Sequence, residues 1–111
     1  MTTPNKFAVL LKPTDEQPAL DRAAQYSRVD PSISVVAVRV VNNYKEENVE
    51  QITLKEKANF EMLKRKYASI QNFDFKVVFD KNVAVGFNAE CKTCNYSLAV
   101  ISANKRHALK D

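Results

Sequence analysis

The sequence contains a single glycine, Gly86, among 111 residues. Loops that bind phosphate need several glycines, because their backbone N–H groups must approach the anion closely at φ values that other residues avoid. One glycine cannot form the phosphate-binding loop of nucleoside triphosphatases or the three-glycine fingerprint of dinucleotide-binding enzymes. The composition therefore argues against a kinase-like, GTPase or dehydrogenase function.

Long apolar runs are also missing from the sequence. No run approaches the roughly 18 residues that are needed to cross a bilayer. The first residues, MTTPNK, lack the charged-then-apolar layout of a secretory signal. We therefore expect a cytoplasmic protein with no membrane partner. The length suits one hydrophobic core, so we expect a single domain over residues 1–111.

The charge balance is only modestly basic, with a formal net charge of +4. The excess lies in two clusters, Lys64–Lys66 and Lys105–Lys110. Neither cluster alternates with aromatic residues in the way that binding of single-stranded nucleic acid requires. A solvated helix face and a solvated tail account for both clusters, so we expect no nucleic-acid partner.

Four apolar runs of strand length alternate with segments of helical pattern. The run at 98–101, LAVI, is wholly apolar and predicts a strand that is buried on both faces. The run at 33–41 is rich in β-branched residues and predicts a central strand, whereas the alternation at 73–79 is typical of an edge strand. The predicted strands cover residues 7–11, 33–41, 73–79 and 98–101.

Three helices are expected between these strands. Thr14 and Gln17 have the spacing of a capping box, which predicts a first helix that ends near Arg28. Apolar residues at three- and four-residue spacing predict a second helix over 49–70 and a short third helix over 83–94. Gly86 costs the third helix about 1 kcal/mol relative to Ala, and we expect it to permit close packing against the sheet. Such alternation indicates an α/β fold with a mainly parallel sheet and helices on both sides.

The order of these elements, with the segments QPALDRA at 17–23 and FKVVFD at 75–80, resembles the universal stress protein family. These two segments are most similar to the first half of the E-type tandem members of the family. The resemblance implies a three-layer α/β/α domain of the adenine nucleotide alpha hydrolase type, with strand order 3-2-1-4. It also implies that the last helix and strand of the family are lacking. The fourth strand would then be an edge, and we expect a homodimer or another protein to cover it.

The same resemblance implies where an adenine nucleotide would bind. ATP-binding members have an acidic residue after the first strand and a glycine-rich stretch after the fourth, whereas this chain has Lys12 and the glycine-free segment Ser102–His107. We therefore expect no cofactor, with ATP or AMP as the alternative. If a nucleotide binds, the expected site residues are Lys12, Pro13, Val40, Val41, Ser102, Ala103, Asn104 and Lys105.

Cys91 and Cys94 form the only CxxC motif. The pair could be redox-active if a thiol pKa were lowered, or could supply half of a zinc site shared between two subunits. The third interpretation is that both cysteines are small packing residues of the third helix. No other metal site is expected, because the single histidine, His107, is distant in the sequence.

The sequence thus favours a regulatory or binding module of the stress-protein type that is not an enzyme and acts through dimerisation or a protein partner. Two alternatives stay open. One is a stress protein that binds an adenine nucleotide, and the other is a small thiol protein that uses Cys91 and Cys94.

Overall fold

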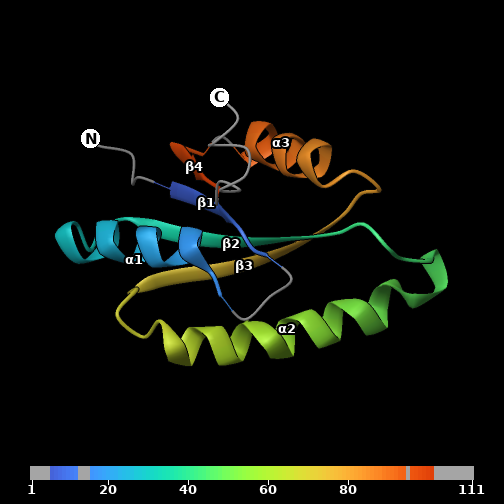
Figure 1. The fold of residues 1–111 in the computed structure, drawn as a ribbon, viewed down its shortest axis with the longest axis horizontal. Helices are drawn as coiled ribbons and strands as arrows, with labels where there is room; N and C mark the ends of the chain where they lie inside the picture. Colours follow the sequence, from blue (N-terminus) through green and yellow to red (C-terminus); the bar gives the residue numbers. More distant parts are fainter. Residues whose placement is uncertain (1–5, 13–15, 95, 102–111) are drawn as a thin grey trace.

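The structure is a computed structural model that describes residues 6–12, 16–94 and 96–101. These residues form an α/β fold in which strands and helices alternate (Figure 1). The elements in chain order are β1 (Lys6–Leu10), α1 (Pro18–Val29), β2 (Ser34–Val41), η1 (Glu46–Asn48), α2 (Val49–Lys66), β3 (Asn72–Phe79), α3 (Val83–Cys94) and β4 (Leu98–Val100).

The described strands form one four-stranded sheet in the order β3-β2-β1-β4, and every neighbouring pair is parallel. Helices α1 and α2 pack on one face of the sheet, and α3 packs on the other (Figure 1). Right-handed crossovers require this arrangement, because the chain moves from β1 to β3 in one direction and then returns past β1 to β4. The predicted three-layer fold and its strand order are confirmed.

The two central strands carry the core on both faces. Val9 and Val35 are fully buried on the side of α1 and α2, whereas Ala8 and Val38 are fully buried on the side of α3. Alternate residues of a strand point to opposite faces, so a strand that is covered on both sides must be apolar at nearly every position. This requirement explains the β-branched run that predicted the second strand.

The prediction that the second helix continues to residue 70 is wrong. Helix α2 ends at Lys66, and Tyr67 leaves the helical conformation with φ −108° and ψ 45°. The turn that follows carries a hydrogen bond from the Ile70 N–H to the Tyr67 carbonyl, at 3.0 Å. Both side chains of this turn are buried in the core on the α1 side. The apolar spacing of Tyr67 and Ile70 therefore reports burial, but not continued helix.

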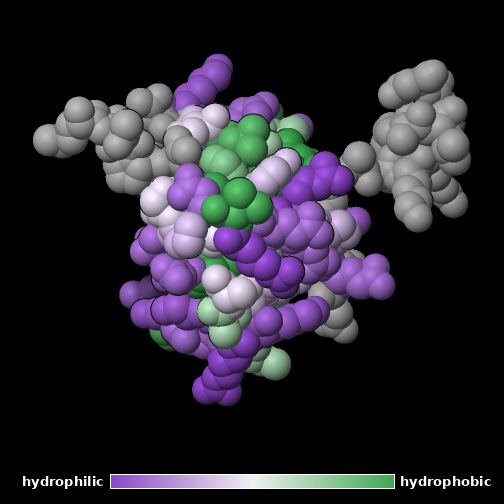
Figure 2. Space-filling view, turned by 90° about the vertical axis from the view of Figure 1, so that its left-hand side faces the viewer, coloured by the Kyte–Doolittle hydropathy of each residue, from purple (hydrophilic) through white to green (hydrophobic). Residues whose placement is uncertain are grey.

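The prediction that the fourth strand is buried on both faces is also wrong. Leu98 is 41% exposed and Ala99 is exposed, and only Val100 within β4 is buried. Strand β4 pairs with β1 on one side, and no described strand pairs with its other side. Figure 2 shows the end of the molecule where the strands begin, with hydrophobic residues gathered in the upper half, at the height of β1 and β4.

Gly86 provides a direct test of the packing between α3 and the sheet. A Cβ atom at Gly86 would lie 2.8 Å from Asp80 Cβ and 3.1 Å from Val40 Cγ1. Asp80 Cβ is fixed to the backbone and cannot move away easily. We therefore predict that Gly86→Ala lowers the free energy of unfolding by about 1 to 3 kcal/mol, although Ala is the better helix former. Urea denaturation measures this change. Asn88→Ala, at an exposed position of α3, is the control and should not destabilise; a Gly86→Ala protein of unchanged or higher stability would contradict the close contact.

Candidate functional site

A groove of about 550 Å³ lies between α2 and the start of α1. Its sides come from elements far apart in the sequence, namely the end of β1, strands β2 and β3, and the last three turns of α2. We refer to this feature as the α1–α2 groove. Its volume is in the range of small-ligand sites, so it is the candidate functional site.

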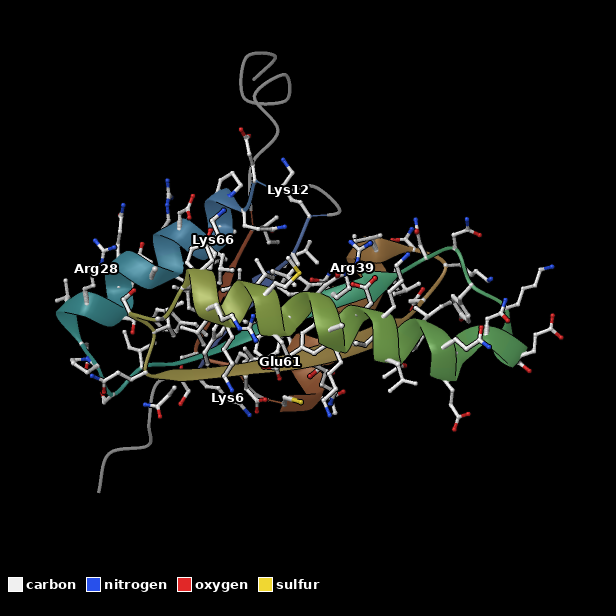
Figure 3. All side chains as sticks on the ribbon, turned by 90° about the horizontal axis from the view of Figure 1, so that it is seen from below. Lys6, Lys12, Arg28, Arg39, Glu61 and Lys66 are labelled. Carbon is white, nitrogen blue, oxygen red and sulfur yellow. The ribbon has the colours of Figure 1, made fainter. Side chains whose placement is uncertain are left out.

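Four charged side chains line the α1–α2 groove. Lys12, Arg39 and Lys66 are cationic, and Glu56 is the one carboxylate among the described lining residues. Arg39 Nε lies 3.5 Å from Glu56 Oε1, and both side chains are largely buried. Figure 3 shows Lys12 near the start of α1, Lys66 near the end of α2, and Arg39 further along the side of α2. No ion pair of Lys12 or Lys66 is found within the described residues, so the groove has an excess of positive charge.

Apolar side chains form the deeper part of the groove. Phe60 of α2 stacks on Phe75 of β3 with a centroid distance of 4.8 Å and an interplanar angle of 11°. Leu11 and Leu63 continue this surface, and Met62, which is 68% exposed, lies at the groove opening. In the neighbouring strand, the fully buried Ala37 is the register partner of Phe75. The groove therefore joins an apolar floor to a cationic rim.

Gln17 fixes the backbone at the end of β1. Its side-chain Nε2 donates to the Lys12 carbonyl at 2.8 Å, and its Oε1 accepts from the Lys12 N–H at 3.0 Å. The predicted capping box differs from this arrangement, because α1 begins at Pro18 and Gln17 itself is the N-cap residue. Thr14 lies outside the described residues. The Gln17 side chain thus bonds the backbone groups that follow β1, and it does not cap the start of α1.

The two helices are joined at one end of the groove. The Tyr67 hydroxyl, which follows α2, donates to Asp21 Oδ1 of α1 at 2.5 Å. Burial of the phenol, followed by this contact with Asp21, raises the pKa of Tyr67 far above its usual value. The phenol therefore stays protonated and keeps its hydrogen bond at every pH near neutrality. This contact limits how far α2 can move away from α1.

The predicted nucleotide site is described only in part. Lys12 is exposed at the end of β1, while Val40 and Val41 end β2 with buried side chains. The adjacent parallel strands bring these positions to the same edge of the sheet. Pro13 and residues 102–105, which include Ser102, Ala103, Asn104 and Lys105, lie outside the described residues, so that part of the site stays a prediction.

The CxxC motif lies in the last turn of α3. Cys94 Sγ donates to Glu90 Oε2 at 3.0 Å, and the Tyr96 hydroxyl donates to the same oxygen at 3.1 Å. Cys91 packs against the core on the α3 side. Burial, the Glu90 carboxylate and Cys94 raise the pKa of the Cys91 thiol. A redox-active thiol needs the opposite shift, so this environment favours the packing interpretation over the thiol-protein alternative.

Sequence reasoning missed Arg39, Glu56 and Lys66 as site residues. Arg39 had a signal, since it is the one charge in an otherwise apolar central strand, and a charge there needs a partner or a ligand. Glu56 and Lys66 carried no signal that distinguishes them from the other charges of α2. Their role depends on which face of the helix meets the groove.

The described ranges contain no group of three or more His, Cys, Asp or Glu side chains that could hold a metal ion. Within the same part of the chain, no helix has both the length and the apolar character to span a membrane.

Comparison with known proteins bears on the fold. No protein-family profile matches the chain, and no curated protein matches it. Among solved structures, the crystal structure of protein Rv1636 from Mycobacterium tuberculosis H37Rv is similar, with a TM-score of 0.61 and 13% sequence identity. The match covers 92% of this chain and 73% of that one. At this identity the similarity shows the fold alone.

Gln17→Glu tests whether the hydrogen bonds to Lys12 hold the site together. The Gln17 side chain is 5% exposed, and a carboxylate there can accept from the Lys12 N–H but cannot donate to its carbonyl. We predict a loss of about 2 to 3 kcal/mol in the free energy of unfolding at neutral pH. Because the ionised side chain is the form that is penalised, burial beside the Lys12 carbonyl raises the pKa of the introduced glutamate in the folded state. The loss should therefore shrink as the pH falls from neutrality towards about 4, since the protonated side chain can donate again.

The matched control is Gln25→Glu, which makes the same change at an exposed position of α1. Denaturant titrations at both pH values measure the two variants. Equal stabilities of the Gln17→Glu and Gln25→Glu proteins would show that the bonds to Lys12 contribute little.

Proposed function

We propose that this protein is a UspA-like regulatory or binding module that does not hydrolyse ATP and whose ligand site is the α1–α2 groove. The observation that carries the proposal is the composition of that groove, whose described lining residues include three cations and one carboxylate around an apolar floor. A concave, mostly apolar site with a few convergent polar groups is the usual form of a small-molecule site.

The state of the backbone at the sheet edge supports a function without nucleotide hydrolysis. Phosphate sites depend on free backbone N–H groups. The Lys12 N–H and carbonyl are both bonded to Gln17, and the Val41 carbonyl accepts from the Asp80 N–H at 3.2 Å. Lys12 also occupies the position at which ATP-binding universal stress proteins carry an acidic residue. An adenine nucleotide that bound at this edge would meet backbone groups that are already hydrogen-bonded.

The exposed side of β4 supports the expected protein partner. Leu98 and Ile101 are 41% and 56% exposed, although both are large apolar residues. A strand edge of this kind is suited to cover by a second copy of the chain or by another protein. This partner stays a prediction, and the groove lies on a different part of the surface.

Nucleotide binding and hydrolysis can be tested directly on the purified protein. We predict no phosphate release from Mg-ATP and no upward shift of the melting temperature with ATP, AMP or a cyclic nucleotide at millimolar concentration, because the ligand would not favour the folded state. The variant Lys12→Asp restores the acidic residue that ATP-binding members share. It should also fail to bind, since the charge alone does not free the backbone groups. Phosphate release above a protein-free control, or a reproducible upward shift with any of the nucleotides, would contradict the proposed function.

A further inference from the structure

The charge in the α1–α2 groove indicates the sign of its ligand. Arg39 and Glu56 form an ion pair and largely neutralise each other. Lys12 and Lys66 remain, and neither has an ion pair among the described residues. Lys66 Nζ lies 5.6 Å from the Tyr67 ring centroid, which holds its side chain near the junction with α1. Two cations that line the same groove favour a ligand that carries negative charge.

The apolar floor indicates that the ligand also has an apolar part. Phe60, which stacks on Phe75, is itself buried, whereas Phe75 and Leu63 are only partly buried. Met62 exposes 68% of its surface at the opening, so apolar surface is left for a ligand to cover. Burying such surfaces against a hydrocarbon chain or ring removes them from water, which is favourable in proportion to the area covered. A small inorganic anion would leave this floor exposed.

The start of α1 argues against a polyphosphate at this site. Pro18 is the first residue of α1 and has no backbone N–H, and Asp21 places a carboxylate in the first turn. Both features weaken the attraction that a helix N-terminus has for a highly charged anion. A single negative charge, which Lys12 and Lys66 can neutralise, fits the groove better.

We propose that the α1–α2 groove binds a monoanionic amphiphile, in which a carboxylate meets Lys12 and Lys66 and an apolar chain or ring lies on Phe60 and Phe75. This inference rests on the proposed function and specifies its ligand class. The groove volume of about 550 Å³ accommodates a ligand of ordinary small-molecule size. Glu56 has a defined part in the proposal, because it competes with the ligand for Arg39.

Decanoate is the probe for this proposal, and calorimetric titration of the intact chain measures its binding. We expect saturable binding of one decanoate per chain, with much weaker binding of 1-decanol, which lacks the charge, and of acetate, which lacks the chain. Raising the salt concentration should weaken decanoate binding, because the lysines are accessible to solvent. Absence of saturable decanoate binding, or equal binding of decanol, would overturn the proposal.

Variants that each remove one charged residue test where the carboxylate of decanoate binds. Lys12→Gln and Lys66→Gln should each weaken decanoate binding about two- to fivefold, as expected for partly exposed charges. The controls Lys6→Gln and Arg28→Gln remove cations outside the groove, and Figure 3 shows both residues away from its charged rim. They should leave the affinity unchanged. Glu56→Gln should strengthen binding, because Arg39 is then released to the ligand.

The variants also separate this inference from the proposed function. Equal affinities of the groove variants and the control variants would overturn the amphiphile site, and the absence of phosphate release from ATP would leave the proposed binding module standing. Phosphate release that the Lys12→Gln change abolishes would overturn both. Circular dichroism of each variant verifies that an affinity change does not come from loss of the fold.

Discussion

The site depends on the pair of hydrogen bonds between the Gln17 side chain and the Lys12 backbone. An amide that bonds both the N–H and the carbonyl of one residue acts like a short additional strand, and it ends β1 at a defined position. The bonds fix the position of the Lys12 backbone, from which its side chain extends, relative to the start of α1. They also engage two backbone groups at the sheet edge where the resemblance to universal stress proteins placed a nucleotide site. Gln17, which is buried, thus helps to shape the α1–α2 groove and weakens the case for a nucleotide site at the sheet edge.

The groove follows from the way in which the sheet is covered. Helices α1 and α2 lie on the same face, and they are joined at one end by the hydrogen bond from Tyr67 to Asp21. Ala37 of β2 packs in the core beside Phe75 of β3. Arg39 lies two residues further along β2 and therefore points to the same face. The groove thus takes Arg39 from β2, whereas Lys12 follows β1 and the apolar floor comes from α2 and β3.

Much of the fold could be predicted from the sequence, because β-branched runs and helical spacing report burial directly. The pattern predicted β2 and α3, but it misjudged Tyr67 and Leu98. The strand order came from the resemblance to universal stress proteins and not from the pattern. Tyr67 fits the helical spacing because it packs in the core. Leu98 belongs to β4, whose other side pairs with no strand among the described residues. The groove could not be predicted, since it depends on how α2 is rotated about its own axis. That rotation decides which residues of α2 face β2. Among the charges of the groove, only Arg39 carried a signal in the sequence.

Backbone amide chemical shifts during a decanoate titration test the central claim most directly. The account predicts that the largest changes occur at Lys12, Gln17, Arg39 and the last turns of α2, while the amides of α3 change little. Changes concentrated at α3 or along β4, with the amides of Lys12 and Arg39 unaffected, would contradict it.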